Sequence, residues 1–139
     1  MQKVTLIGNL GKDPVMRYAP SGDAVTSFSV ATSEKWTDKS GEKMERTTWW
    51  TINAWGKMGE ACNAYLTKGK KVYVEGAMVC DSKTGGPRLW TRNDGTTGAS
   101  FEVKALKVEF LSSKNDSTAT TDDGQPEPGQ TISGDSIPF

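Results

Sequence analysis

Residues 47–57 read Thr-Thr-Trp-Trp-Thr-Ile-Asn-Ala-Trp-Gly-Lys and contain three of the five tryptophans of the chain. In a β-strand, alternate side chains lie on opposite faces of the sheet. Trp50 and Ile52 then share a face that suits a core. Trp49 and Trp55 lie on the other face, roughly 20 Å apart, among small polar residues. The stretch therefore predicts a strand with one aromatic, solvent-facing side on which a flat ligand can stack.

The segments on either side predict more strands and one helix. Two strands precede it, at residues 3–10 and 24–35, and the second has small side chains on both faces, as tightly curved barrel strands do. Two strands follow, at residues 70–80 and 99–111. Between them and the tryptophan strand, apolar side chains at helical spacing predict an amphipathic helix over residues 57–68: Met58, Ala61, Cys62, Tyr65 and Leu66.

Within the last predicted strand the apolar positions change parity. Phe101, Val103 and Ala105 are odd, whereas Leu106 and Val108 are even. A β-bulge between residues 105 and 106 keeps both halves packed on the same side, as expected where a sheet curls to close a barrel.

This order of elements predicts the fold class: all-β with one helix. Three strands, a helix and two strands are the order of an OB-fold, a five-stranded Greek-key barrel with its helix between strands three and four. The tryptophan strand is strand three. The binding face of the fold lies on strands two and three, between the 1–2 loop and the 4–5 loop. We place this domain at residues 1–112.

Charge and composition set the C-terminal part of the 139-residue chain apart. Residues 1–114 hold all 17 Lys and Arg and 12 of the 17 Asp and Glu, a balance of +5, and the charged residues of 115–139 are all Asp or Glu. A basic body with an acidic tail is typical of polyanion binding, although charge balancing for solubility explains it equally. Residues 113–134 have almost nothing to bury and predict a disordered linker. Apolar side chains return in residues 135–139.

Two polar segments carry the remaining tryptophans. Residues 34–46 predict a hairpin loop with several cations and Trp36. A structural interpretation is that Trp36 folds back as a lid over the barrel mouth. Trp90 lies in a short extended piece, residues 88–92, which the turn at residues 93–95 reverses.

Four indoles and a group of cations therefore fall on one side of the predicted barrel. The indoles are Trp36, Trp49, Trp55 and Trp90. The cations are Lys35, Lys39, Lys43, Arg46, Lys57, Arg88 and Arg92. Single-stranded nucleic acid requires this combination, because bases stack on aromatic rings and Lys and Arg follow the phosphates. Across proteins of this kind, single-strand-binding OB-folds among them, each stacked base is worth roughly 1–3 kcal/mol. Every base has a π-face, so little sequence preference is expected.

Other classes of function fit less well. Trp50 points inward and is expected in the core. Sugar-binding modules also expose tryptophan, but sugar stacking needs no surrounding cations. The chain has no histidine, no carboxylate cluster and no phosphate-cradling loop, so we expect neither an enzyme nor a cofactor. Two isolated cysteines, Cys62 and Cys80, do not make a zinc site, and Cys62 is expected as a buried free thiol.

Several motifs resemble the bacterial single-stranded DNA-binding protein (SSB) family, in the family's order. They include Lys-Val-Thr-Leu-Ile-Gly-Asn-Leu-Gly-Lys-Asp-Pro at residues 3–14 and Val-Tyr-Val-Glu-Gly at residues 72–76. Further matches lie at residues 17–18, 22, 31–36, 48–49, 55–57 and 65–69. The C-terminal Asp-Ser-Ile-Pro-Phe is similar to the family's acidic tip. The resemblance covers residues 2–80 and 99–112 and the tip.

The resemblance implies an OB-fold homotetramer that wraps single-stranded DNA in replication, recombination and repair. The family's stacking tryptophans are matched by Trp36, Trp49 and Trp90, and Trp55 stands where a stacking Phe is usual. Its phosphate-contacting positions are matched by Lys39, Lys57 and Lys68. Trp50 occupies a position near the family's subunit interface, often His. Residues 80–89 depart from the family pattern and look like an insertion before Trp90.

The tip resembles the peptide by which the family docks replication, recombination and repair enzymes. The residues that match it are Asp135, Ile137, Pro138 and Phe139. Ser136 replaces an acid, so docking is expected to depend more on the apolar end and the terminal carboxylate. An alternative function is an accessory nucleic-acid chaperone of the RNA or primosome type, but such proteins usually lack a long linker that ends in Phe.

The location is expected to be cytoplasmic and nucleoid-associated, with no membrane partner. No apolar run approaches the roughly 20 residues that span a bilayer. The N-terminal residues lack the features of signal and transit peptides, so reduced thiols are expected.

Overall fold

Residues 1–112 are the part of the chain that the computed structural model describes, and they form eight strands and one helix. The elements are β1 Val4–Leu10, β2 Val15–Tyr18, β3 Ala24–Thr37, β4 Lys43–Trp55, α1 Gly56–Tyr65, β5 Lys71–Met78, β6 Leu89–Thr91, β7 Thr97–Ala99 and β8 Phe101–Phe110. The predicted linker and tip, residues 113–134 and 135–139, lie outside the described residues. Within residues 1–112, no helix is long and apolar enough to cross a membrane.

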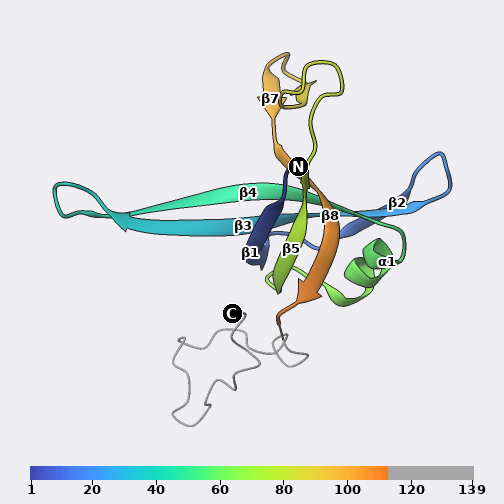
Figure 1. The fold of residues 1–139 in the computed structure, drawn as a ribbon, viewed down its shortest axis with the longest axis horizontal. Coiled ribbons are helices and arrows are strands. Elements are labelled where there is room, and N and C mark those ends of the chain that lie inside the picture. Colours follow the sequence, from blue (N-terminus) through green and yellow to red (C-terminus); the bar gives the residue numbers. More distant parts are fainter. Residues whose placement is uncertain (113–139) are drawn as a thin grey trace, which may run out of the picture.

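Five strands close into a barrel (Figure 1). The strand order is β1-β5-β8-β4-β3-β2, and an additional pairing of β1 with β3 closes the ring. Only the β4–β8 pair is parallel among these described pairs. Helix α1 follows the third barrel strand, β4, so the predicted OB-fold is confirmed. At the closure, a Cβ on Gly8 would lie 2.1 Å from the Ala31 carbonyl oxygen, so glycine is what lets β1 approach β3.

The core fills the barrel and extends beneath α1. Its fully buried aliphatic residues come from the barrel strands: Val30, Ile52, Val72, Val74 and Val103. Cys62 and Leu66 join the same cluster from α1 and the residue after it. The Thr26 hydroxyl, also fully buried, donates to the Gly59 carbonyl oxygen at 2.6 Å and ties β3 to the helix. The buried free thiol predicted for Cys62 is confirmed.

The predicted bulge in the last strand is also confirmed. Glu75 pairs with Lys107 and Gly76 pairs with Ala105, which leaves Leu106 as the extra residue of β8. Leu106 is 68% exposed, while Ala105 is buried. The bulge therefore turns one apolar side chain outward so that the strand on either side of it keeps facing the core.

Helix α1 is shorter than the sequence suggests, ending at Tyr65 and not at residue 68. Leu66 is extended and buried, because the chain turns inward as soon as the helix stops. Tyr65, expected on the apolar face, is 67% exposed and packs its ring 6.0 Å from that of Phe110 at the margin of the sheet.

The polar segment at residues 34–46 was predicted as a loop, but most of it forms paired strands. β3 and β4 stay paired out to Thr37 and Lys43, and together form a two-stranded ribbon that projects beyond the barrel (Figure 1). We call residues 33–47 the ribbon. None of them is buried, so the sequence has no apolar alternation that would mark them as strands. Backbone pairing continues the hairpin, together with exposed cross-strand contacts such as the Arg46–Glu34 ion pair.

A second projection, residues 80–99, we call the finger (Figure 1). It contains the two-stranded sheet of β6 and β7, which is separate from the barrel sheet. The turn predicted between Trp90 and the last strand is present, with Arg92 and Thr96 closing it through a 2.7 Å backbone hydrogen bond. The last barrel strand starts at Phe101 and not at Ala99, because Ala99 belongs to the finger.

Candidate nucleic-acid interface

The two faces of the tryptophan strand differ as predicted. Ile52 and Ala54 are fully buried on the inner face of β4. Trp49 and Trp55, on the outer face, are 55% and 40% exposed. Across β3 the outer partners are small, since Asn53 pairs with Ser27 and the two side chains hydrogen-bond at 2.7 Å. Nothing large on this part of β3 competes for the space above the indoles.

Trp50 has a different environment from its neighbour. Its ring packs against the core cluster and lies 5.2 Å from the ring of Phe101. The indole Nε1 donates to Thr32 Oγ1 at 2.9 Å, so its polar atom is satisfied inside the protein. The inward position expected for Trp50 is confirmed, although the side chain is only half-buried.

Trp36 lies on the ribbon and not in a loop. It pairs with Met44 and is 42% exposed, with the Arg46 guanidinium 5.3 Å from its ring centroid. Arg46 also pairs with Glu34 at 2.7 Å. Strand alternation puts Trp36 on the face of the ribbon opposite to Trp49, so the expected arrangement of all four indoles on one side does not hold at this position. Trp36 pairs with Met44 on the ribbon, and among the described residues it is not one of those packed against the core cluster, which does not support the lid interpretation.

Trp90 lies in the finger, paired with Gly98 across β6 and β7. Its side chain is 44% exposed, and the Arg92 guanidinium lies 4.8 Å from the ring centroid. Arg92 is itself held by donating to the Thr97 carbonyl oxygen at 2.8 Å. In the finger's turn, the hydroxyl and backbone N–H of Thr96 lower the pKa of Asp94, so this carboxylate stays ionised and keeps the turn closed at neutral pH.

A hollow of about 360 Å³ connects the tryptophan strand with the base of the finger. It is lined by Thr47, Thr48, Trp49, Thr51, Ala99, Ser100 and Phe101. Phe101 was predicted with Val103 as an inward-facing residue, but it is 53% exposed at this rim. Parity alone cannot show that β8 begins at Phe101, where the barrel wall ends and one side chain has no core to enter.

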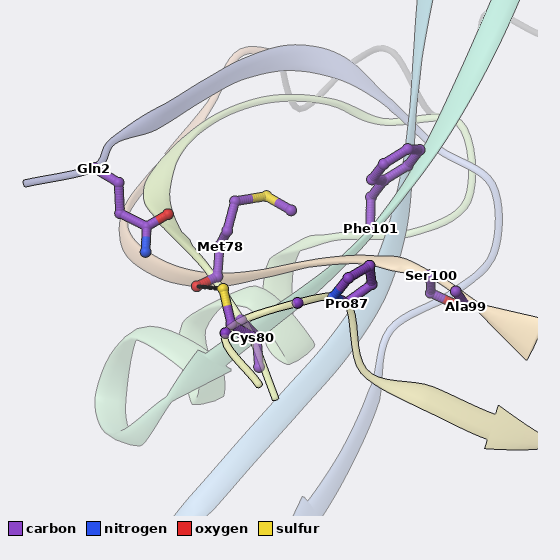
Figure 2. A pocket seen from close by; sticks show the side chains of 10 residues that line it. Gln2, Met78, Cys80, Pro87, Ala99, Ser100 and Phe101 are labelled. Atoms are coloured by element: carbon purple, nitrogen blue, oxygen red, sulfur yellow. Dashed lines mark hydrogen bonds between the residues drawn. The ribbon is translucent and has the colours of Figure 1, made fainter. Parts of the chain in front are cut away.

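Figure 2 shows a second pocket, of about 350 Å³, at the finger base. Met78, Cys80, Pro87 and Phe101 point into it from the end of β5, the finger and the start of β8. It contains none of the predicted stacking or phosphate-binding residues. The Cys80 thiol is free and exposed.

The predicted phosphate-binding cations divide among several places. The ribbon carries Lys39, Lys43 and Arg46, and the finger carries Arg88 and Arg92. Lys57 lies at the start of α1, and Lys68 lies in the loop that follows the helix. Arg88 pairs with Glu102 at 3.6 Å. Such exposed ion pairs are worth only about 0–1 kcal/mol, so a phosphate can compete for these guanidinium groups. Among these cations, Arg46 lies over the Trp36 ring and Arg92 over the Trp90 ring, and Lys57 follows Trp55 by two residues.

Residues 1–112 contain no cluster of metal-binding side chains, and one of their two thiols is buried. No group of three or more His, Cys, Asp and Glu side chains there is placed to hold a metal ion. Burial raises the pKa of the Cys62 thiol to about 11, so this group is neither ionised nor accessible at neutral pH.

Comparison with known proteins connects this geometry to a family. The model of the single-strand binding protein family matches residues 1–111. Two Neisseria meningitidis proteins, each named single-stranded DNA-binding protein, are 39% identical over 118 residues, which is 85% of this chain and 64% of theirs. Single-stranded DNA-binding protein 1 of Chlorobaculum tepidum is 39% identical over 126 residues, 88% of this chain and 72% of that protein. The chain thus spans about two thirds of the length of these relatives.

Solved structures show the same fold. The Plasmodium falciparum SSB in complex with single-stranded DNA has a TM-score of 0.67 at 29% identity, over 81% of this chain and 96% of that one. The single-stranded DNA-binding protein of Thermus aquaticus, a deletion mutant, has a TM-score of 0.64 at 27% identity, over 82% and 52%. The family match over residues 1–111, on a barrel with this aromatic face, shows that the chain belongs to the single-strand binding protein family.

Proposed function

We propose that this chain is a non-catalytic protein that binds and wraps single-stranded DNA without sequence preference. The observation that carries the proposal is the set of exposed indoles on a single-strand binding protein barrel. Trp49 and Trp55 stand on β4, and Trp36 and Trp90 stand on two projections beside cations. Bases stack on such rings while Lys and Arg neutralise phosphates. The names of the relatives and the DNA complex of a structural neighbour support the same ligand.

The test is titration of the protein with oligo-dT. We expect strong quenching of tryptophan fluorescence, which excess duplex DNA does not reverse. The logarithm of the affinity should fall with the logarithm of the salt concentration, with a slope of about −0.7 for each phosphate contact. Absence of quenching would refute the proposal, and equal affinity for oligo-rU would favour an RNA chaperone.

Assembly into a homotetramer is the second part of the proposal. The aromatic pair of Trp50 and Phe101 supports it, because Phe101 is 53% exposed and Trp50 is only half-buried in one copy of the chain. Half-exposed aromatic pairs are typical of surfaces that a partner covers. Sedimentation of the chain alone and with oligo-dT of graded length measures both the number of subunits and the length of strand that they wrap. A monomer at every concentration contradicts this part alone.

Recruitment of other enzymes is the third part. Asp135, Ile137, Pro138 and Phe139 are proposed to dock replication, recombination and repair enzymes at the nucleoid, on the basis of their resemblance to the family's tip. The charge difference between residues 1–114 and the acidic residues 115–139 supports two separate binding functions, one for a polyanion and one for proteins.

A further inference from the structure

Two of the exposed indoles rest on glycine. A Cβ on Gly98 would lie 2.5, 2.6 and 2.8 Å from three adjacent atoms of the Trp90 six-membered ring. Three nearly equal distances to bonded ring atoms mean that the glycine lies against the face of the ring and not against its edge. A Cβ on Gly11 would lie 2.4 and 2.8 Å from two bonded atoms of the Trp49 ring and no closer than about 3.2 Å to its other atoms, so this glycine lies against the edge of the indole.

The contact explains two features of the finger. Gly98 is buried although β7 is exposed on both sides of it, because Trp90 covers it from the opposite strand. Trp90 still leaves 44% of its surface exposed, and Trp49 leaves 55%. The Trp90 ring therefore has one face closed by the backbone, the Trp49 ring is contacted at its edge, and both keep much of their surface free.

We infer that Gly11 and Gly98 are positioning residues for base stacking: Gly98 supports one face of Trp90 and Gly11 admits the edge of Trp49, and each fixes its indole as a platform for a base of the strand. The inference rests on the proposed function. A ring that is already held in place loses little conformational entropy when a base stacks on it. More of the stacking free energy is therefore available for binding. In the finger, Arg92 braces the same ring at 4.8 Å while bonded to the backbone at Thr97.

Other glycines of the barrel allow two strands to approach each other closely. The atoms nearest to a Cβ on Gly8 or Gly76 are carbonyl oxygens, at 2.1 and 2.2 Å, so substitution there pushes against the backbone itself. At Gly11 and Gly98 the obstacle is the far end of a side chain, and neither glycine has a positive φ. An added methyl group there therefore moves the indole and leaves the barrel in place.

The experiment compares Gly98→Ala, Gly11→Ala and a matched control, Gly86→Ala. Gly86 is also in the finger, has no positive φ, and its Cβ would meet only Thr84 Oγ1 at 3.5 Å. Affinity for labelled oligo-dT is measured by anisotropy, and the tryptophan environment of the free protein by near-UV circular dichroism. We expect the first two variants to bind about five- to 150-fold more weakly, the range for one stacked base, with changed spectra and unchanged melting temperature. Gly86→Ala should match the wild type in each.

A double variant decides whether Gly98 acts through Trp90. If it does, Gly98→Ala in a Trp90→Ala background changes the affinity no further. Independent, additive losses overturn the inference, as does a Gly98→Ala or Gly11→Ala variant that binds like the wild type. Wild-type protein that fails to bind oligo-dT is a different result, because it refutes the proposed function itself.

Discussion

At the scale of single residues, the contacts of an indole ring separate a structural tryptophan from a ligand-binding one. The Trp50 ring packs against the core and Phe101, and its N–H donates a hydrogen bond to Thr32. Trp49, the preceding residue, contacts Gly11 with the edge of its ring and leaves 55% of its surface exposed. The two residues are adjacent in sequence and chemically identical, yet strand alternation gives them separate roles.

This difference predicts opposite effects of two substitutions. Trp49→Ala should weaken oligo-dT binding by about five- to 150-fold and change the free energy of unfolding by about 1 kcal/mol or less. Trp50→Ala should lower the free energy of unfolding by about 2–4 kcal/mol, since it removes packing and a part-buried hydrogen bond. Urea denaturation and anisotropy titrations measure the two quantities. Equal losses of stability in both variants would contradict this division.

The two thiols should differ as sharply. Cys80 is exposed and should react at once with a thiol reagent at pH 8, whereas Cys62 should react only after unfolding. The folded pKa of Cys62 is raised to about 11, above the value near 8.5 of an unfolded chain. Stability from this thiol is therefore complete below about pH 8.5 and lost as the pH rises toward 11, by up to about 3 kcal/mol. Cys80→Ser should leave no fast-reacting thiol; two fast thiols in the wild type would show that Cys62 is accessible.

Sequence patterns predict residue environments well in the middle of elements and poorly at their ends. Trp49, Ile52 and Val103 lie within strands that have neighbours on both sides, and alternation places each of them correctly. Phe101 and Tyr65 obey the same periodicities but are exposed, because one begins β8 and the other ends α1. At an end, the strand or helix extends beyond the core, so a side chain there has nothing to pack against.

At the scale of elements, the ribbon contributes surface and no core. None of residues 33–47 is buried, yet they carry Trp36 and three of the predicted phosphate-binding cations. Its strands are held by cross-strand contacts such as the Arg46–Glu34 pair, which is worth about 1 kcal/mol or less. The sequence could not mark this segment as strand, because a hairpin that buries neither face shows no apolar period.

Shortening the ribbon should therefore separate binding from stability. Ser33 and Thr47 are paired, so an Asn-Gly turn can replace residues 34–46 and join them directly. We expect a melting temperature within a few degrees of the wild type and a loss of oligo-dT affinity of about tenfold or more, from one stacking ring and several phosphate contacts. Scanning calorimetry and anisotropy measure the two effects. Unfolding of the shortened chain would mean that the ribbon supports the barrel.

At the scale of the whole molecule, the order of elements and the barrel were predictable, but the strand pairings that close the barrel were not. One helix between the third and fourth strands is enough to favour an OB-fold. The pairing of β1 with β3 joins residues 9–10 to residues 30–31, and that of β4 with β8 joins Trp50 to Phe101. Contacts so distant in sequence leave no local pattern beyond small residues such as Gly8 and the bulge at Leu106.

We propose that the barrel with its two projections binds DNA and that residues 135–139 dock enzymes. This division of the two functions gives the last prediction. Deletion of residues 137–139 should leave oligo-dT affinity unchanged, because the stacking indoles all lie between Trp36 and Trp90. The same deletion should abolish co-purification of replication and repair enzymes from an extract of the source cells, measured by quantitative mass spectrometry. Ser136→Asp is the matched variant, since it restores the acid of the family's tip and should raise the yield. Equal enzyme yields from the full and truncated chains would assign docking to the barrel, and weaker DNA binding after truncation would show that the two tasks are not separate.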